Sequence, residues 1–363
     1  MAGLTRLNAR INRRRLIAAS GGAVLGASAL GAISPLAAQD AIIATLVTDT
    51  AGIGDQNFND LANAGGERAA EELGVDFRVI ESQTAADYEP NLTLGLEQGD
   101  IVAAIGFLLV DAVNVVAPQF PDKSVVHIDA ESTQPNVLGY IFREHEGAFL
   151  GGVLAGLFST SGRVGMVGGQ RIPPVIKYEV GFAAGAMTVN PDVVFTPSYA
   201  DDFEDPALGK ELTLALFEGG VDVVMQAAGR TGIGCFDAAK EKGPGFWVVA
   251  GDTDQAHLGP DNQLGYVRKG VDNAVFDAIK AKAEGSFEGG TQNLGIVEGG
   301  MDFAGFHASV DQSIIDTVMA YRQAIIDGVV TVPATDEEFA TFTPAPLDGM
   351  TSPSASPAAT PAT

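Results

Sequence analysis

From Ala41 onward, short apolar runs alternate with longer amphipathic stretches, and this alternation constrains the fold more than any other feature of the chain. The first apolar runs cover 41–49, 77–82, 100–107 and 124–130, with helical patterns between them at 58–74, 91–99 and 111–120. Short apolar runs separated by helical patterns are typical of βαβ units. Such units predict a parallel sheet with helices on both faces.

The same pattern starts again in the second half of the chain. Strands are predicted at 163–169, 193–200, 222–229 and 246–252, with helices at 146–159, 175–187, 206–220 and 233–243. The 363 residues are enough for two lobes of this kind. We therefore predict an α/β protein with two doubly wound parallel-sheet lobes.

The segments after the second run are predicted to return to the first lobe, and a helix at 311–328 closes the fold. The predicted domains are therefore 39–140 plus 252–306 for lobe I and 141–251 plus 307–333 for lobe II.

Both ends of the chain differ in composition from its middle. Residues 1–38 contain the run NRRRLIAAS, an apolar stretch of small residues and a small-residue site, which together are typical of a twin-arginine signal peptide. An uncleaved membrane anchor is the alternative. No cysteine lies near the site, so we expect an exported protein of the periplasm or the outer face of the cell membrane that is not a lipoprotein. Residues 334–363 are rich in Pro, Thr, Ser and Ala and are predicted to be a disordered tail.

The charge of the chain makes nucleic acid an unlikely partner. The formal net charge is −25, and five of the 21 Lys+Arg lie in residues 1–38, which hold no acid. The remaining 16 basic residues face 46 acidic ones, which gives this part a net charge of −30 and repels phosphate backbones. The single cysteine, Cys235, forms no internal disulfide and supports no cysteine-based metal site. The four histidines lack zinc-site spacing, so no metal, cofactor or catalytic residue is predicted.

Ligands of open parallel sheets bind beyond the carboxyl ends of the strands, and the residues predicted there are mostly acids, amides and glycines. Phe58 and Phe203 are the exceptions. A phenylalanine at a polar strand end has no evident core to fill, which indicates a stacking surface for a ring. Each candidate also has a structural interpretation: Phe58 as a staple at a helix start, Phe203 as a cover of the sheet edge, and the acids Asp49 and Asp252 as N-caps.

Several ordered motifs resemble those of the basic membrane protein (BMP) family of ABC-transporter solute-binding proteins. They are DTAGIGDQNFND at 49–60, FREHEGAFLGGVLAGL at 142–157, RVGMVGGQRIPPVIKYEVGFAAG at 163–185, AAGRTGIGCFDAAKE at 227–241 and GDTDQ at 251–255. The resemblance extends from about residue 41 to 333. It implies a type 1 periplasmic-binding-protein fold, two lobes on a multi-strand hinge, and a monomer that delivers a ligand to the membrane subunits of an ABC importer.

The resemblance also implies a purine nucleoside, such as adenosine, guanosine or inosine, as the ligand. Phe58 and Phe203 would sandwich the purine. Asp49 and Asn59 would bind its edge, with Asp129 nearby, and Gly229, Asp252 and Lys269 would hold the ribose. The motifs depart from the family at Gln56, where a basic residue is usual, and at Arg230, which interrupts a Gly-rich turn and is expected near the pocket mouth.

Other functions remain open at this point. The same fold binds sugars and other small metabolites, and a ligand sensor would need the same site without transport. A nucleoside hydrolase is the enzymatic alternative, but no clustered DxDxxxD-type metal site or poised base is visible in the sequence.

Overall fold

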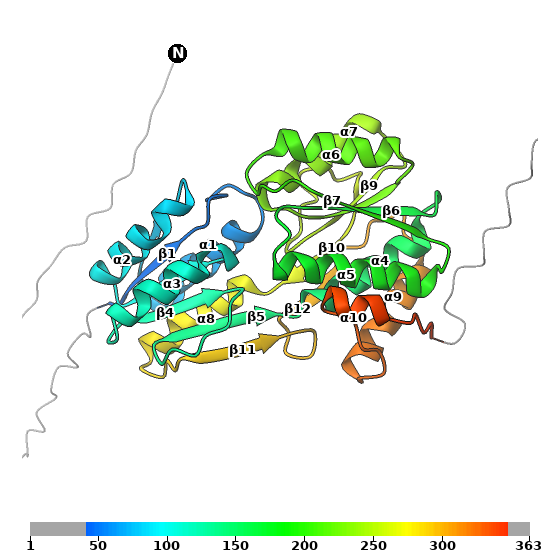
Figure 1. The fold of residues 1–363 in the computed structure, drawn as a ribbon. Coiled ribbons are helices and arrows are strands. Elements are labelled where there is room, and N and C mark those ends of the chain that lie inside the picture. Colours follow the sequence, from blue (N-terminus) through cyan, green and yellow to red (C-terminus); the bar gives the residue numbers. More distant parts are fainter. Residues whose placement is uncertain (1–40, 348–363) are drawn as a thin grey trace, which may run out of the picture. The chain divides into compact units, whose positions relative to one another are not determined.

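The computed structural model describes residues 41–347, which form two six-stranded sheets with helices packed on them (Figure 1). The predicted signal peptide at 1–38 and the end of the predicted tail, 348–363, lie outside the described residues.

The first sheet has the strand order β11-β5-β4-β3-β1-β2, and all its neighbours are parallel. Its strands are β1 (Ile43–Val47), β2 (Asp76–Ile80), β3 (Ile101–Ile105), β4 (Ser124–Ile128), β5 (Val137–Phe142) and β11 (Gly290–Leu294). The central strands β3 and β4 are buried along their whole length, which explains their continuous apolar sequences.

Helices cover this sheet on both faces. They are α1 (Phe58–Leu73), α2 (Tyr88–Gln98), α3 (Val110–Val116) and α8 (Val271–Ala283), with short 3₁₀ turns between some of them. Helix α1 ends at Gly74, whose left-handed backbone (φ 70°) closes the last turn. Helices α1 and α8 pack against each other although 197 residues separate their last and first residues.

The second sheet has the order β12-β10-β9-β8-β6-β7 and is parallel except for the β10–β12 pair. Its strands are β6 (Arg163–Gly168), β7 (Val194–Tyr199), β8 (Val223–Ala227), β9 (Trp247–Ala250), β10 (Gln263–Lys269) and β12 (Met301–Ala304). The helices of this lobe are α4 (Glu144–Phe158), α5 (Pro173–Val189), α6 (Pro206–Glu218), α7 (Ile233–Lys242) and α9 (Gln312–Ile326).

The chain passes between the two sheets three times, after β5, after β10 and after β11. Strands β10 and β12 belong to the second sheet, so the prediction that residues 252–306 return to the first lobe is wrong for these two strands. β10 pairs with β9 in parallel, but a loop rather than a helix connects them. The sequence between the two strands therefore has no helical pattern to indicate that they belong to one sheet. Helix α8 and β11 do lie with the first sheet.

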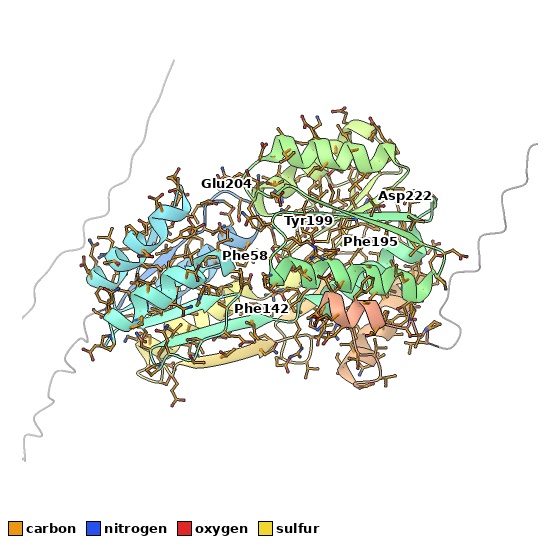
Figure 2. All side chains as sticks on the ribbon, viewed as in Figure 1. Phe58, Phe142, Phe195, Tyr199, Glu204 and Asp222 are labelled. Atoms are coloured by element: carbon orange, nitrogen blue, oxygen red, sulfur yellow. The ribbon has the colours of Figure 1, made fainter. Side chains whose placement is uncertain are left out.

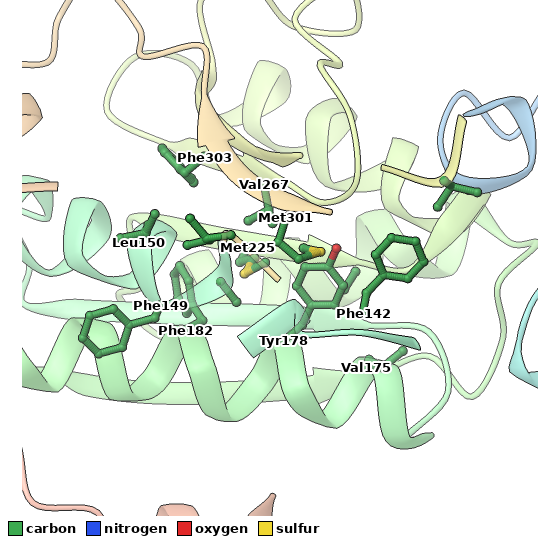
Figure 3. Close-up of a cluster of buried hydrophobic side chains, with 14 of the residues drawn as sticks. Phe142, Phe149, Leu150, Val175, Tyr178, Phe182, Met225, Val267, Met301 and Phe303 are labelled. Atoms are coloured by element: carbon green, nitrogen blue, oxygen red, sulfur yellow. The ribbon is translucent and has the colours of Figure 1, made fainter. Parts of the chain in front are cut away.

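Helices α4 and α5 form the closest helix pair of the second lobe, and glycines make this approach possible. A Cβ on Gly152 would lie 2.0 Å from the carbonyl oxygen of Phe182, and one on Gly185 would lie 2.0 Å from that of Phe149. Figure 3 shows the core beside these helices, including Phe149, Phe182 and Met225. The tight pairing fixes the N-terminal halves of both helices, which carry Glu144 and Tyr178.

The described part of the predicted disordered tail contains a helix, α10 (Asp336–Thr341). Thr335 caps it by accepting a hydrogen bond from the Glu338 amide, and Arg171 donates two hydrogen bonds to Asp336. For residues 336–341 the prediction of disorder is therefore wrong. The acidic first turn Asp336–Glu338, which favours a helix start, is the signal that the Pro- and Ala-rich composition around it obscured.

Candidate functional site

A cavity lies where the carboxyl ends of the strands of both sheets meet, and it contains about 550 Å³ of space between atoms, its mouth included. All eight residues predicted for the ligand site line it: Asp49, Phe58, Asn59, Asp129, Phe203, Gly229, Asp252 and Lys269. They come from six separate loops and strand ends in both lobes.

The loop between β1 and α1 and the first turn of α1 supply a first group of polar side chains, Asp49, Asp55 and Asn59, which we call the edge cluster. Asp55 accepts hydrogen bonds from the backbone amides of Asn57, Asn59 and Asp60 and so caps the first turn of α1. The Asn59 amide nitrogen donates to Asp49 Oδ1 at 2.8 Å and to Asp55 Oδ2 at 3.1 Å. These bonds hold the three side chains in one arrangement at the cavity wall.

Asp49 carries an unusual charge state for an aspartate. Burial raises the pKa of its carboxyl group to about 7, and this outweighs the hydrogen bond from Asn59, which lowers it. The neighbouring Asp55 raises the pKa further through charge repulsion. Near neutral pH the Asp49 side chain is therefore close to the midpoint of its titration.

Lys269, at the end of β10, forms the centre of a second group, which we call the lysine cluster: Lys269, Asp129 and Glu144. Its ammonium lies 2.7 Å from Asp129 Oδ1 and 3.0 Å from Glu144 Oε1, and only 2% of its side chain is exposed. Burial opposes the charge on Lys269, but the surrounding carboxylates outweigh it and raise the lysine pKa. The cluster links β4 and α4 to β10 of the second sheet.

The pKa values of the two acids of the lysine cluster are shifted in opposite directions. Burial raises the pKa of Asp129 to about 6 even though Lys269 opposes it. Burial also disfavours the charge of Glu144, but Lys269 and Lys177, whose ammonium lies 3.2 Å from Glu144 Oε2, lower its pKa. The two lysines thus favour the ionised form of Glu144.

Asp252 occupies a strained position after β9. Its backbone is left-handed (φ 64°), as is that of Asp129 after β4 (φ 68°), and both side chains line the cavity. A left-handed non-glycine residue costs free energy that the surrounding structure must offset, and such residues cluster at binding sites. The Tyr178 hydroxyl donates to Asp252 Oδ1 at 2.5 Å, and burial raises the pKa of Asp252.

The two predicted stacking residues line the cavity from different lobes. Phe58 begins α1, and the Lys269 ammonium lies 5.0 Å from its ring centroid (Figure 2). Phe203 follows β7, and its ring occupies the space that a side chain on Gly169 would need, because a Cβ there would lie 2.2 Å from the ring. Gly229, with φ 54°, lets the chain turn beside Phe203.

Sequence reasoning did not select three polar residues that shape the site: Asp55, Glu144 and Tyr178. Asp55 lies in the loop before α1 and Glu144 at the start of α4, both inside the quoted motifs. Both acids are buried, and an acid without another explained role inside a motif could have been selected from the sequence. The sequence does not distinguish Tyr178 from a core residue, because it lies at a position that fits the apolar spacing of α5.

Gln56 and Arg230, the two departures from the family motifs, contribute contacts across the mouth of the cavity. Arg230 donates from Nη2 to the Ile53 carbonyl at 3.0 Å. Gln56 accepts at its carbonyl from Gln255 Nε2 at 2.9 Å, and its Oε1 lies 2.7 Å from His257 Nε2. Thus three residues of the second lobe contact the 53–56 loop of the first.

The histidines and the cysteine have structural surroundings. Burial lowers the pKa of His127 and of His145 to about 4, which keeps both rings neutral. Cys235 is fully buried in α7, and burial raises its pKa to about 12. Within residues 41–347, no group of three His, Cys, Asp or Glu side chains is arranged to hold a metal ion, and no helix has the length and apolar character needed to span a membrane.

The chain is similar to known proteins over most of its described length. Residues 42–336 match the Bmp family model, described as ABC transporter substrate-binding protein PnrA-like. The chain is 32% identical over 313 residues to the ABC transporter nucleoside-binding protein BmpA of Lactococcus lactis, covering 80% of this chain and 89% of that one. It is 33% identical over 273 residues to a protein of Pyrococcus abyssi named an uncharacterized lipoprotein, covering 71% and 68%.

A solved structure is similar over the same region. The solute-binding protein of an ABC transporter system from Aeropyrum pernix has 29% sequence identity and a TM-score of 0.76, and the match covers 82% of this chain and 95% of that one. The two sheets of this chain, with the strand orders described above, have the architecture of the type 1 periplasmic-binding-protein fold.

Proposed function

The chain belongs to the Bmp family of PnrA-like ABC transporter substrate-binding proteins, and on that premise we propose that it captures a purine nucleoside in the interlobe cavity and delivers it to an ABC importer. Membership of the family gives it a small-molecule ligand, an ABC transporter as partner and a place outside the cytoplasm. The family model, the Lactococcus lactis relative and the Aeropyrum pernix structure are each described as a binding protein.

The observation that carries this proposal is the pair of phenylalanines, Phe58 and Phe203, that line one cavity from opposite lobes. A flat base that enters between them would offer a face to each ring. Stacking of a base on an aromatic side chain contributes about 1–3 kcal/mol in nucleic-acid complexes, and the same physics applies to a nucleoside. Two-sided stacking from two lobes also couples ligand binding to lobe closure.

The polar residues divide between the two parts of a nucleoside. Asp49 and Asn59 bind the edge of the base. Asp252, Lys269 and the backbone at Gly229 hold the ribose hydroxyls, and Asp129 orients Lys269 by its ion pair. The cavity has four aspartates and one paired lysine on its wall, which suits a neutral ligand better than a phosphorylated one.

Export and anchoring belong to the same proposal. We assign residues 1–38 as a twin-arginine signal peptide and the mature protein as a monomer without a lipid anchor. A Pyrococcus relative is named a lipoprotein, and its name therefore differs from our assignment of a protein without a lipid anchor. The only cysteine, Cys235, is buried in α7 and unavailable for a lipid.

Calorimetric titration of refolded mature protein with adenosine, guanosine, inosine, cytidine and ribose tests the proposal. Refolding removes any co-purified ligand. We expect tight binding of purine nucleosides and weak or no binding of cytidine and ribose. Binding of ribose alone would instead favour a sugar ligand, silence across the set would refute the nucleoside assignment, and release of free base during incubation would favour a hydrolase.

A further inference from the structure

The hydrogen-bond directions in the edge cluster are fixed by its two carboxylates. The Asn59 amide nitrogen donates to Asp49 Oδ1 and to Asp55 Oδ2. Rotating the amide by half a turn would place its oxygen against both carboxylate oxygens, and with the two acids ionised neither side would supply a proton. The nitrogen therefore faces the two acids, and the Asn59 oxygen faces away from them.

Two acceptor atoms remain in the edge cluster after its internal bonds are made. Asn59 Oδ1 is buried and receives no hydrogen bond from residues 41–347. Asp49 Oδ1 is occupied by Asn59 and by the Ala51 amide at 3.0 Å, whereas no donor among the described residues contacts Asp49 Oδ2. That oxygen lies beside the cavity-lining Gly106, 3.4 Å from where a Cβ on this glycine would be.

Asp55 does not add to this pair, because both its oxygens accept bonds from the protein. The edge cluster has also used its side-chain donor, the Asn59 amide nitrogen, on the two carboxylates. The atoms of these two cavity-lining residues that lack a protein donor are therefore both acceptors, Asp49 Oδ2 and Asn59 Oδ1.

We propose that Asp49 and Asn59 make the site selective for a base edge with two adjacent N–H donors, so that guanosine binds more tightly than inosine and inosine more tightly than adenosine. This inference rests on the proposed function and names the base. Guanine presents N1–H and the N2 amino group side by side. Hypoxanthine presents only N1–H, and adenine places an acceptor, N1, beside its amino group.

The cost of a mismatch sets the expected ratios. A buried acceptor left without a donor costs enough to weaken binding about tenfold or more. At pH 8 we expect guanosine to bind about tenfold more tightly than inosine and about a hundredfold more tightly than adenosine, whose N1 would face a carboxylate oxygen.

The protonation of Asp49 makes the preference depend on pH. Burial raises the pKa of Asp49 to about 7, and the charges of Asp55 and Glu204 add to this increase. The charge of Asp49 in turn raises the pKa of Tyr88. Below pH 7 Asp49 gains a proton and becomes a donor that fits adenine N1. Guanosine needs the ionised form, so its affinity falls as the pH falls, and adenosine gains affinity over the same range.

The test is a titration of the refolded mature protein with guanosine, inosine and adenosine at pH 8 and pH 5.5, repeated with Asp49→Asn. In this variant the amide oxygen keeps the bonds from Asn59 and Ala51, and the amide nitrogen replaces Oδ2 as a permanent donor. We expect the wild-type guanosine-to-adenosine affinity ratio to fall at least tenfold between pH 8 and pH 5.5. Asp49→Asn should prefer adenosine at both values.

Asp76→Asn is the matched control, since Asp76 lies exposed on β2 and should leave the ranking unchanged. Equal or tighter binding of adenosine by the wild type at pH 8 would overturn the inference while leaving nucleoside binding intact. So would an Asp49→Asn variant that keeps the wild-type ranking. Failure of all three nucleosides to bind would reject the proposed function and this inference together. If Asp49→Asn does not fold, the pH dependence of the wild type decides.

Discussion

The edge cluster and the lysine cluster lie on the wall of the same cavity, yet they treat their charges in opposite ways. In the lysine cluster the ammonium of Lys269 contacts the carboxylates of Asp129 and Glu144, so buried charge is balanced within the protein. In the edge cluster Asp49 is buried without a cation, and its pKa rises to about 7. The contrast indicates that the lysine cluster holds the two lobes in place, whereas the edge cluster remains unsatisfied until a ligand arrives.

The largest effect is expected where the balanced cluster loses its cation. Lys269→Met leaves Asp129 buried without a counter-charge and Glu144 with only Lys177 beside it, which costs about 3–5 kcal/mol of stability. Urea unfolding of the ligand-free protein measures this loss. The control is Lys240→Met, whose side chain is exposed and pairs with Asp237 on the surface. A loss below about 1 kcal/mol would mean that the lysine cluster does not hold the lobes, and the comparison would fail.

In the edge cluster, removing a charge should stabilise the ligand-free protein instead of destabilising it. The folded-state pKa of Asp49 lies above its unfolded value of 3.8, so its stabilising contribution is complete below pH 3.8 and is lost as the pH rises through about 7. Asp49→Asn stays neutral at every pH. At pH 8 the ligand-free variant should therefore be more stable than the wild type by about 4 kcal/mol, and this difference should shrink toward pH 5.

Urea unfolding at the two pH values measures this difference, with Asp76→Asn as the exposed control. A variant that is less stable than the wild type at pH 8, or a difference that does not change with pH, would show that Asp49 is not an unsatisfied acid.

Substitutions of residues that line the cavity should weaken ligand binding without unfolding the protein. Phe58→Ala removes one stacking face, and Asp252→Ala removes an acceptor for the ribose hydroxyls. Each should weaken nucleoside binding at least tenfold, equivalent to about 1.4 kcal/mol, while the protein remains folded. Calorimetric titration gives the affinities, and circular dichroism checks the fold. Phe120→Ala, on a loop of the first lobe away from the cavity, is the control. Unchanged affinity in both variants would reject the assigned site.

Much of the site was predictable because chain topology brings strand ends together. Asp49, Asp129 and Asp252 each follow a predicted strand, and the carboxyl ends of parallel strands meet at one edge. The motif resemblance then selected Phe58 and Phe203 from nineteen phenylalanines. Tyr178 escaped prediction because its hydroxyl acts from a helix whose apolar pattern is that of an ordinary core helix.

The parts of the fold that were missed depend on long-range pairing. Strand β5 was not predicted, since it follows β4 without a helix and contains Gly139, which lies against the Ala130 carbonyl. Strand β10 was assigned to the wrong sheet, because sequence alone does not tell which of two sheets a strand joins after a loop. Register and partner are decided by packing in three dimensions, and apolar periodicity reports only that a strand exists.

The smallest predicted effect concerns the contacts that cross the cavity mouth, which neither cluster supplies. Arg230, Gln255 and His257 from the second lobe all contact the 53–56 loop, which includes Asp55 of the edge cluster. Gln56 adopts a left-handed backbone (φ 55°), so the loop bears strain that these contacts offset. The contacts therefore favour the closed arrangement, and their loss should speed ligand release more than it slows capture.

Arg230→Ala removes one charge-assisted hydrogen bond and should raise the nucleoside dissociation rate about threefold to tenfold, with association changed less than twofold. Stopped-flow displacement of a fluorescent nucleoside measures both rates, and Arg78→Ala, which loses only a surface pair with Asp76, is the control. If dissociation is unchanged, closure is driven by the ligand and the lysine cluster alone. If it rises as expected, the two departures from the family motifs, Gln56 and Arg230, act on how long the ligand stays bound, whereas the edge cluster determines which base is chosen.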